Sequence, residues 1–246
     1  MFSRYPILFK TPFVRKTPFV RPVINRRIIS KSVVSPGGPN QRRYVRFLQD
    51  NRVSLLLCEG PPKTGKTWFA CASAVQELRK ETVKRIVITH PVDERIHSKL
   101  IFDIFEDFYN RSDIYNMVQD GTIEISSIPF LFGRTINHAF MIANDMQYST
   151  CEHMRDLTNC IGYGSRMVIT GNLASSDVKP DNGLSDLIHR IEHVNHPPED
   201  VRVIRMGTCD IHSNQIQSKI WDLYNPKPLQ PEHSPFSVFS LKKFRD

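Results

Sequence analysis

Acidic residues are missing from the first 49 positions of this 246-residue chain, which hold eleven of its 33 lysines and arginines. The net charge of the whole chain is +8. Because the first 49 residues carry this excess, the remainder of the chain is close to neutral. The imbalance separates a basic N-terminal arm, residues 1–38, from the body of the protein.

Long hydrophobic runs are missing as well. A helix that crosses a bilayer needs about 20 consecutive apolar residues, and no stretch of the sequence provides them. We therefore expect no membrane-spanning segment and no membrane partner.

The cysteines are scattered and odd in number. None of them has CxxC spacing, and they stand at Cys58, Cys71, Cys151, Cys160 and Cys209. This pattern excludes a disulfide framework and a cysteine-based zinc site. It indicates a reducing compartment, and we expect a cytoplasmic protein.

The arm contains a tandem hexamer, KTPFVR, at residues 10–15 and 16–21. The prolines at positions 6, 12, 18 and 22 oppose a continuous helix, because proline lacks an N–H donor and clashes with the preceding turn. Three interpretations of the arm remain open. It is a solvated tail, an organelle-targeting peptide that would direct the protein out of the cytoplasm, or a segment that binds single-stranded RNA through its lysines, arginines and aromatic rings. The helix-breaking residues 35–39, SPGGP, mark the boundary with the body.

In the body, short continuous apolar runs alternate with helical patterns. The predicted strands are 53–58, 85–89, 122–126, 139–143, 167–170 and 201–205, and the predicted helices are 68–80, 97–119, 150–161, 184–191 and 216–224. Continuous apolar strands of this length indicate an α/β fold with a mainly parallel sheet that helices cover on both faces. We expect one domain over residues 39–224, followed by an irregular proline-rich tail at 225–246.

A phosphate-binding loop follows the first predicted strand and precedes a helix. Its pattern is Gly60-x-x-x-x-Gly65-Lys66-Thr67, and this strand–loop–helix context is the one that such a P-loop requires. Backbone N–H groups and the helix N-terminus face phosphate oxygens, Lys66 reaches the outer phosphates, and the Thr67 hydroxyl holds Mg²⁺. The predicted nucleotide-binding residues of the loop are Gly60, Pro61, Pro62, Lys63, Thr64, Gly65, Lys66 and Thr67.

Several segments, taken in order, resemble the PhoH-like proteins, which are P-loop ATPases related to the cores of superfamily 1 helicases. The segments are Asn40-Gln41-x-x-Tyr44, the P-loop, Thr89-His90-Pro91-Val92, Gly133-Arg134-Thr135, Asn144-Asp145-Met146-Gln147 and residues 162–171. The resemblance implies a RecA- or helicase-like P-loop NTPase fold, a three-layer sandwich. It also implies ATP and Mg²⁺ as cofactors, an adenine contact for Gln41, and RNA as a partner.

The chain departs from the family where hydrolysis is concerned. The family sequence DEAQ is here Asn144-Asp145-Met146-Gln147, the family arginine before Pro91 is His90, and a family aspartate is Asn172. Asn144 can join Thr67 at the metal but adds no charge. Asp145, the predicted catalytic residue, is one methylene shorter than glutamate, and a misplacement of about 1 Å can cost on the order of a hundredfold in rate.

These departures predict ATP binding with weak or lost hydrolysis. Two alternatives remain open: an active helicase-like ATPase with a reorganised site, and a non-catalytic module for nucleic-acid or protein interaction. A cation that offsets charge on the phosphates has five candidates, Arg134, Arg166, Arg190, Arg202 and Arg205.

Two weaker patterns favour ordinary structural roles. The spacing of His189, His193 and His196 could serve a metal, but no carboxylate or cysteine completes the set, so we expect surface histidines. Trp68 and Phe69 are expected to pack in the core rather than to stack on a base.

Overall fold

The structure is a computed structural model that describes residues 35–91, 101–178 and 181–211. In these residues six strands form one sheet in the order β3-β2-β4-β5-β1-β6, and every neighbouring pair is parallel. The strands are β1 (Leu55–Glu59), β2 (Arg85–His90), β3 (Ile123–Ser127), β4 (Ala139–Ala143), β5 (Arg166–Gly171) and β6 (Val201–Arg205). The predicted parallel sheet is confirmed.

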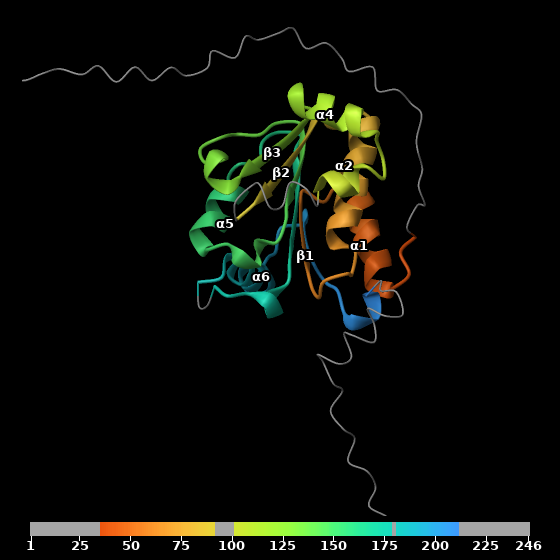
Figure 1. The fold of residues 1–246 in the computed structure, drawn as a ribbon. Helices are drawn as coiled ribbons and strands as arrows, with labels where there is room; N and C mark the ends of the chain where they lie inside the picture. The colour runs from red at the N-terminus through yellow and green to blue at the C-terminus, as the bar shows by residue number, and fades with distance from the viewer. Residues whose placement is uncertain (1–34, 92–100, 179–180, 212–246) are drawn as a thin grey trace, which may run out of the picture.

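Helices cover both faces of the sheet, so the fold is a three-layer α/β sandwich. Figure 1 shows the sheet between α1 and α2 on one side and α5 and α6 on the other. In the described residues the helices include α1 (Pro39–Gln49), α2 (Lys66–Arg79), α4 (Arg111–Gln119), α5 (Cys151–Thr158) and α6 (Gly183–His193). Short 3₁₀ turns follow several strands: η1 (Ile128–Phe130), η2 (Met146–Tyr148), η3 (Leu173–Ser175) and η4 (Thr208–Asp210).

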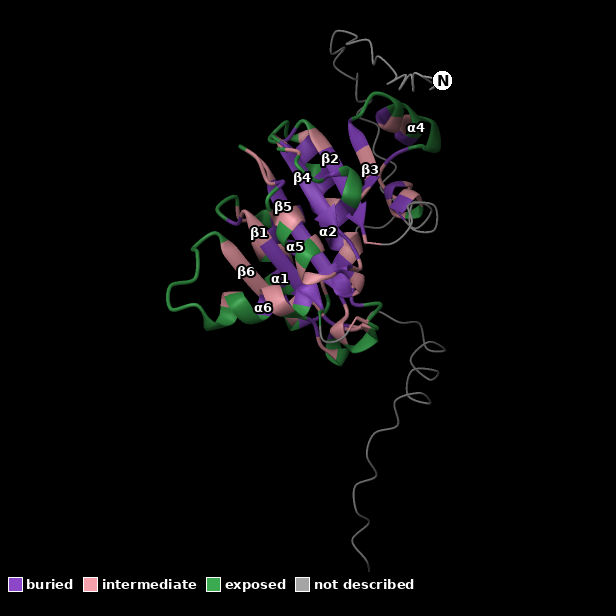
Figure 2. Ribbon diagram, turned by 90° about the vertical axis from the view of Figure 1, so that its left-hand side faces the viewer, coloured by how far each residue is buried: buried purple, intermediate pink, exposed green. Residues whose placement is uncertain are grey.

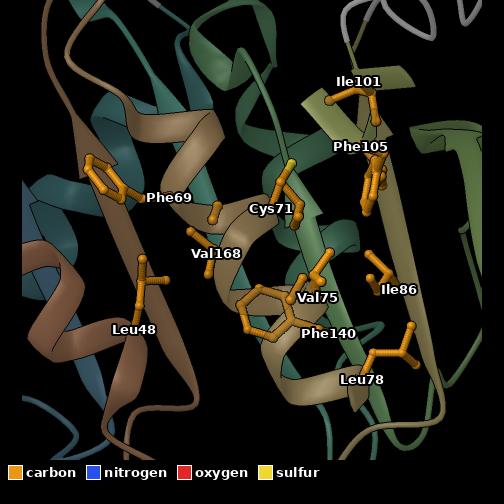
Figure 3. Packing of buried hydrophobic residues seen from close by; sticks show 14 of the residues in the cluster. Leu48, Phe69, Cys71, Val75, Leu78, Ile86, Ile101, Phe105, Phe140 and Val168 are labelled. Atoms are coloured by element: carbon orange, nitrogen blue, oxygen red, sulfur yellow. The ribbon is translucent and has the colours of Figure 1, made fainter. Parts of the chain in front are cut away.

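The continuous apolar strands are explained by burial on both faces. In β4, Phe140 and Ile142 belong to the core beneath α1 and α2, whereas Met141 and Ala143 belong to the core beneath α5 and α6. Figure 2 shows the central strands buried and the outer faces of the helices exposed. Figure 3 shows the first core from close by, with Leu48 and Phe69 on the side of α1 and α2.

Two helix predictions differ from the structure. The sequence analysis did not predict α1, although Pro39 stands at its start and Tyr44 and Leu48 are buried one turn apart. The single helix predicted over 97–119 is wrong in its described part, because residues 101–105 and α4 are separate and Asn110 between them is extended, with ψ of 152°. The predicted helix 216–224 and the tail 225–246 lie outside the described residues.

None of the helices within residues 35–91, 101–178 and 181–211 has the length and apolar character that a bilayer span requires. This agrees with the sequence prediction of no membrane-spanning segment in that part of the chain.

A buried arginine joins the sheet to the end of α1. The Arg166 guanidinium donates to the carbonyl oxygens of Leu48 (2.9 Å) and Phe47 (3.2 Å), and it lies over the Phe140 ring at 5.3 Å from the centroid. The last carbonyls of a helix have no partner within the helix, so Arg166 supplies one. Burial lowers the pKa of this guanidinium. Of the five arginines predicted as cations for a phosphate site, this one caps a helix.

Replacing Arg166 with methionine should destabilise the fold. The change removes the charged donor from two carbonyls at the buried end of α1, which keep only the longer bonds from the Ser73 hydroxyl to Leu48 and from the Asp50 N–H to Phe47, at 3.3 Å each. We expect a loss of about 1–3 kcal/mol in the free energy of unfolding. Urea denaturation measures this loss. Arg190→Met is the matched control, because Arg190 is exposed and pairs with Asp186 on the same helix. A loss of about 0.5 kcal/mol or less is expected in that variant. Equal losses in both variants would contradict the capping role.

Candidate nucleotide-binding site

The P-loop leaves the carboxyl end of β1 and enters the first turn of α2. Gly60 has a φ of 147° and Gly65 a φ of 82°, which favour glycine. A Cβ on Gly60 would lie 2.6 Å from the Met206 carbonyl oxygen, and a Cβ on Gly65 would lie 2.8 Å from the Phe69 ring. Backbone conformation and close packing therefore both require the two glycines of the sequence pattern.

The Lys66 ammonium lies inside this loop. Its Nζ donates to the carbonyl oxygens of Gly60 and Pro61, at 2.7 Å each, and lies 3.4 Å from the Thr64 hydroxyl. Burial lowers the pKa of Lys66, and the neighbouring acidic groups, Asp145 among them, partly oppose that shift. The positive charge is thus held where the loop wraps, and a bound phosphate would compete with two carbonyls for it.

The other predicted loop residues surround Lys66. Thr64 is fully buried and donates its hydroxyl to the Pro61 carbonyl at 2.9 Å. Pro62 and Lys63 are exposed, and Lys63 takes a positive φ of 65°. All eight predicted residues from Gly60 to Thr67 therefore form one continuous loop at the N-terminus of α2, whose unpaired N–H groups favour an anion.

The strand ends bring the predicted metal residues together. Asn144 follows β4 on the face of the sheet that α2 covers, and its Oδ1 accepts from the Thr67 hydroxyl at 2.6 Å and from the Thr170 hydroxyl at 2.9 Å. The Asn144 N–H donates to the Thr89 carbonyl of the next strand at 2.9 Å. Asn144 is buried, so these bonds fix its side chain. The structure places Thr67 and Asn144 in direct contact.

Asn144 also holds the predicted catalytic residue. Its Nδ2 donates to Oδ2 of Asp145 at 2.8 Å, and the His90 Nε2 lies 3.4 Å from the same oxygen. A carboxylate can only accept hydrogen bonds. The amide nitrogen must therefore face Asp145, and the amide oxygen must face the two hydroxyls. Asp145 itself adopts a positive φ of 54°, which sets the angle of its carboxylate.

The donor set suits a magnesium ion that is held largely through phosphate and water. Thr67 offers a neutral hydroxyl oxygen and Asp145 one carboxylate, whereas both lone pairs of the Asn144 amide oxygen already accept from the Thr67 and Thr170 hydroxyls. Mg²⁺ prefers oxygen ligands and commonly uses one or two carboxylates together with substrate phosphates. Within the described residues no group of three or more His, Cys, Asp or Glu could hold a metal by itself. The described residues alone therefore do not form a metal site without the nucleotide.

Gln41 lies against the P-loop, but its amide is fully engaged. Its Nε2 donates to the carbonyls of Thr64 (3.1 Å) and Asp210 (2.9 Å), and its Oε1 accepts from the N–H groups of Gly37 (2.8 Å) and Gly38 (3.1 Å). Its exposed fraction is 1%. The adenine contact that the resemblance implies stays a prediction, and this conformation offers no open hydrogen-bonding edge for it.

Asp210 is a residue that the sequence analysis did not find. Its carboxylate accepts from the Asn40 side chain at 2.8 Å and from the N–H groups of Gly207 (2.9 Å) and Gln41 (3.4 Å). Burial favours a higher pKa, but these hydrogen bonds outweigh it and hold the pKa of Asp210 below its usual value. The carboxylate caps α1, whose own N-cap position is a glycine. A local sequence pattern cannot predict this cap, because Asp210 lies 169 residues from Gln41 in the sequence.

The remaining arginine candidates have partners elsewhere. Arg134 binds Glu124, Arg190 binds Asp186, Arg205 binds Glu192, and Arg202 donates to a carbonyl of its own strand. In the described part of the chain, none of the five arginines is hydrogen-bonded to a residue of the P-loop.

Other family positions have local partners as well. The Asn172 side chain, at an altered family position, donates to the Ser175 hydroxyl at 2.6 Å. Gln147 accepts from the Asn172 N–H at 3.0 Å and is buried.

The aromatic pair after the P-loop and the three spaced histidines have the structural roles that were expected from the sequence. Trp68 packs edge-on against Phe69 and donates to Asp107 at 2.9 Å. His189, His193 and His196 are exposed, and the first two rings stack at 4.0 Å.

These features together define a nucleotide-binding P-loop protein with an α/β fold. The P-loop follows β1, Asn144 follows β4, and one strand, β5, lies between them. The PhoH-like protein family matches residues 33–225, and the chain belongs to that family.

Curated relatives carry the same family name. The chain is 30% identical to a PhoH-like protein of Mycobacterium leprae, over 78% of this chain and 58% of the relative. It is 25% identical to one from Bacillus subtilis, over 75% and 62%, and 27% identical to Protein PhoH of Escherichia coli, over 69% and 52%. The match thus spans less than two thirds of the length of these relatives.

Solved structures show only a partial likeness. A Sulfolobus solfataricus SWI2/SNF2 ATPase core in complex with dsDNA aligns with a TM-score of 0.46 at 12% identity, covering 71% of this chain and 45% of that one. The Pif1 helicase from Candida albicans aligns at 0.42 and 12%, covering 79% and 44%. The sheet order and the P-loop, not these scores, define the class.

Asn144→Asp should make the stability of the fold depend on Mg²⁺. The change replaces the donor to Asp145 with a second carboxylate at hydrogen-bonding distance. Without Mg²⁺ we expect a loss of about 1–3 kcal/mol, because a buried bond becomes a like-charge contact. Added Mg²⁺ should restore most of it, whereas the wild-type protein should respond less. Thermal unfolding with and without Mg²⁺ measures both effects.

Asn172→Asp provides the matched control, because Asn172 also follows a strand of this sheet but donates to a hydroxyl. A Mg²⁺ response of the same size in both variants, or none in Asn144→Asp, would contradict the proposed geometry.

Proposed function

We propose that this protein binds ATP together with Mg²⁺ at the P-loop and hydrolyses it slowly or not at all. One observation carries the proposal: a neutral amide, Asn144, occupies the contact with Thr67 and is bonded to Asp145. Lys66 and the glycines of the loop are arranged for phosphate binding, but the Asn144 side chain beside the proposed metal position has no charge.

The support for binding is the arrangement around Lys66. Its ammonium lies within the loop, the α2 N-terminus begins at the same residue, and the two glycines take the conformations that let the backbone wrap. N–H groups at a helix N-terminus and a lysine ammonium together favour a polyphosphate. The Thr67 hydroxyl donates to Asn144, so its lone pairs remain for a metal.

The support for slow turnover is electrostatic. Transfer of a γ-phosphate depends on positioning and on charge stabilisation around the phosphate. Asp145 is the acid that we propose to orient a water, but the Asn144 amide donates to one of its oxygens, and His90 lies beside the same oxygen. Loss of a cation that stabilises the transition state costs roughly 10³- to 10⁵-fold in rate, and each of the five candidate arginines is bonded elsewhere.

Phosphate release from ATP with Mg²⁺ tests the proposal. We expect release by the wild-type protein close to that of Lys66→Ala, although the wild-type protein binds ATP and the variant does not. Asn144→Asp should raise turnover, because it restores a charge beside the metal. Calorimetric titration with ATP measures binding in the same samples.

The outcomes separate the two halves of the proposal. Wild-type turnover at an ordinary enzymatic rate of about 1 s⁻¹ or more would overturn slow hydrolysis and favour the active helicase-like ATPase. Equal ATP affinity of the wild-type protein and Lys66→Ala would overturn binding at the P-loop and favour a non-catalytic interaction module. No gain in Asn144→Asp would show that charge at this position does not limit the rate.

A second proposal concerns the basic arm. We infer that residues 1–38 bind single-stranded RNA, because they hold eight lysines and arginines and no acidic residue, and because phenylalanines are interspersed among the basic residues. Neutralised phosphates release counterions, and nucleic-acid bases stack on aromatic rings.

The five cysteines are free, which fits a reducing cytoplasm, although an organelle-targeting role for the arm would place the protein elsewhere.

Deleting residues 1–38 should remove most of the affinity for a single-stranded RNA oligonucleotide and should flatten its salt dependence. In the full chain, log Kd should change with log salt concentration by about 0.7 for each phosphate contact. Fluorescence anisotropy at several salt concentrations measures both. An unchanged affinity for the RNA after the deletion would contradict RNA binding by the arm.

A further inference from the structure

The amide of Gln41 has no unused hydrogen-bonding capacity. A glutamine side chain offers two N–H donors and two acceptor lone pairs. In Gln41 the donors are used by the carbonyls of Thr64 and Asp210, and the acceptors by the N–H groups of Gly37 and Gly38. All four partners are backbone groups.

Recognition of adenine by an amide needs an open edge. A glutamine or asparagine that reads adenine donates to one ring nitrogen and accepts from the exocyclic amine at the same time. To present that edge, Gln41 would have to give up one donor bond and one acceptor bond. The Thr64 or Asp210 carbonyl and a glycine N–H would then lose their partner in a place where Gln41 is only 1% exposed.

The neighbouring amide is engaged as well. Asn40 donates its Nδ2 to the Asp210 carboxylate at 2.8 Å. The two side-chain amides that α1 brings to the P-loop therefore bind the protein itself.

We propose that the site recognises the triphosphate and not the base, so that it binds purine and pyrimidine nucleoside triphosphates alike. Gln41 acts as a positioning residue. Its amide lies 3.8 Å from where a Cβ on Gly65 would stand, and its bond to Thr64 fixes the middle of the P-loop. This inference rests on nucleotide binding at the P-loop, and it names the class of nucleotide that binds there.

The test is calorimetric titration of the full chain with ATP, GTP, CTP and UTP, each with Mg²⁺, and with inorganic tripolyphosphate as a probe that has no base. We expect the four nucleotides to bind within about threefold of one another, since a bidentate contact that reads a base would give roughly fivefold discrimination or more. Tripolyphosphate should bind too. Gln41→Met should weaken all four nucleotides by the same factor, because it loosens the loop without removing a base contact.

A preference for ATP over GTP of about fivefold or more, which is the discrimination that a bidentate base contact gives, overturns the proposal. If that preference disappears in Gln41→Met, Gln41 reads the base after all; if it persists, another group does. A wild-type chain that binds neither nucleotides nor tripolyphosphate would overturn the proposed function itself, and this inference with it. The wild-type selectivity decides the matter even if Gln41→Met does not fold.

Discussion

The parallel pairing of four central strands is the constraint on which the rest of the site depends. Because β1, β5, β4 and β2 run the same way, their carboxyl ends meet at one edge, and alternate residues face α2. Asn144 and Thr170 therefore meet there, and the first turn of α2 brings Thr67 against them. A slip of one residue in β4 would turn Asn144 toward α5 and α6 and would separate it from the P-loop.

The amide of Asn144 lowers the negative charge at this edge of the sheet from that of two adjacent carboxylates to that of one. Two adjacent acids beside the hydroxyls of Thr67 and Thr170 would concentrate negative charge that only a cation or a proton could offset. With Asn144, the same position donates a hydrogen bond to Asp145 and still accepts from both hydroxyls. The network is therefore complete without a metal. Where the family has a charged acid, Asn144 makes an internal hydrogen bond to Asp145, and the proposed slow turnover rests on this difference.

Features carried by local pattern could be predicted from the sequence, whereas features carried by distant contacts could not. The apolar strands predicted the parallel sheet, and the P-loop pattern predicted a loop between the first strand and a helix, where β1 and α2 lie. Helix α1 was missed because its cap is Asp210, 169 positions away from Gln41. Arg166 looked like a free cation because nothing in the sequence places it at the end of α1. The break at Asn110 was missed because apolar spacing continues across it.

The spacing Asn40-Gln41-x-x-Tyr44 has an architectural explanation that the sequence alone did not offer. Successive turns of α1 bring these side chains to one face, where Asn40 meets Asp210, Gln41 meets Thr64, and the Tyr44 hydroxyl donates to the Lys66 carbonyl at 3.1 Å. Tyr44 is fully buried. Each contact fixes the P-loop or the segment that braces it. Helix α1, which follows the basic arm, therefore shapes the phosphate loop. Residues 37 and 38, the last two of the arm, donate their N–H groups to Gln41 and so contact the residue that holds the loop.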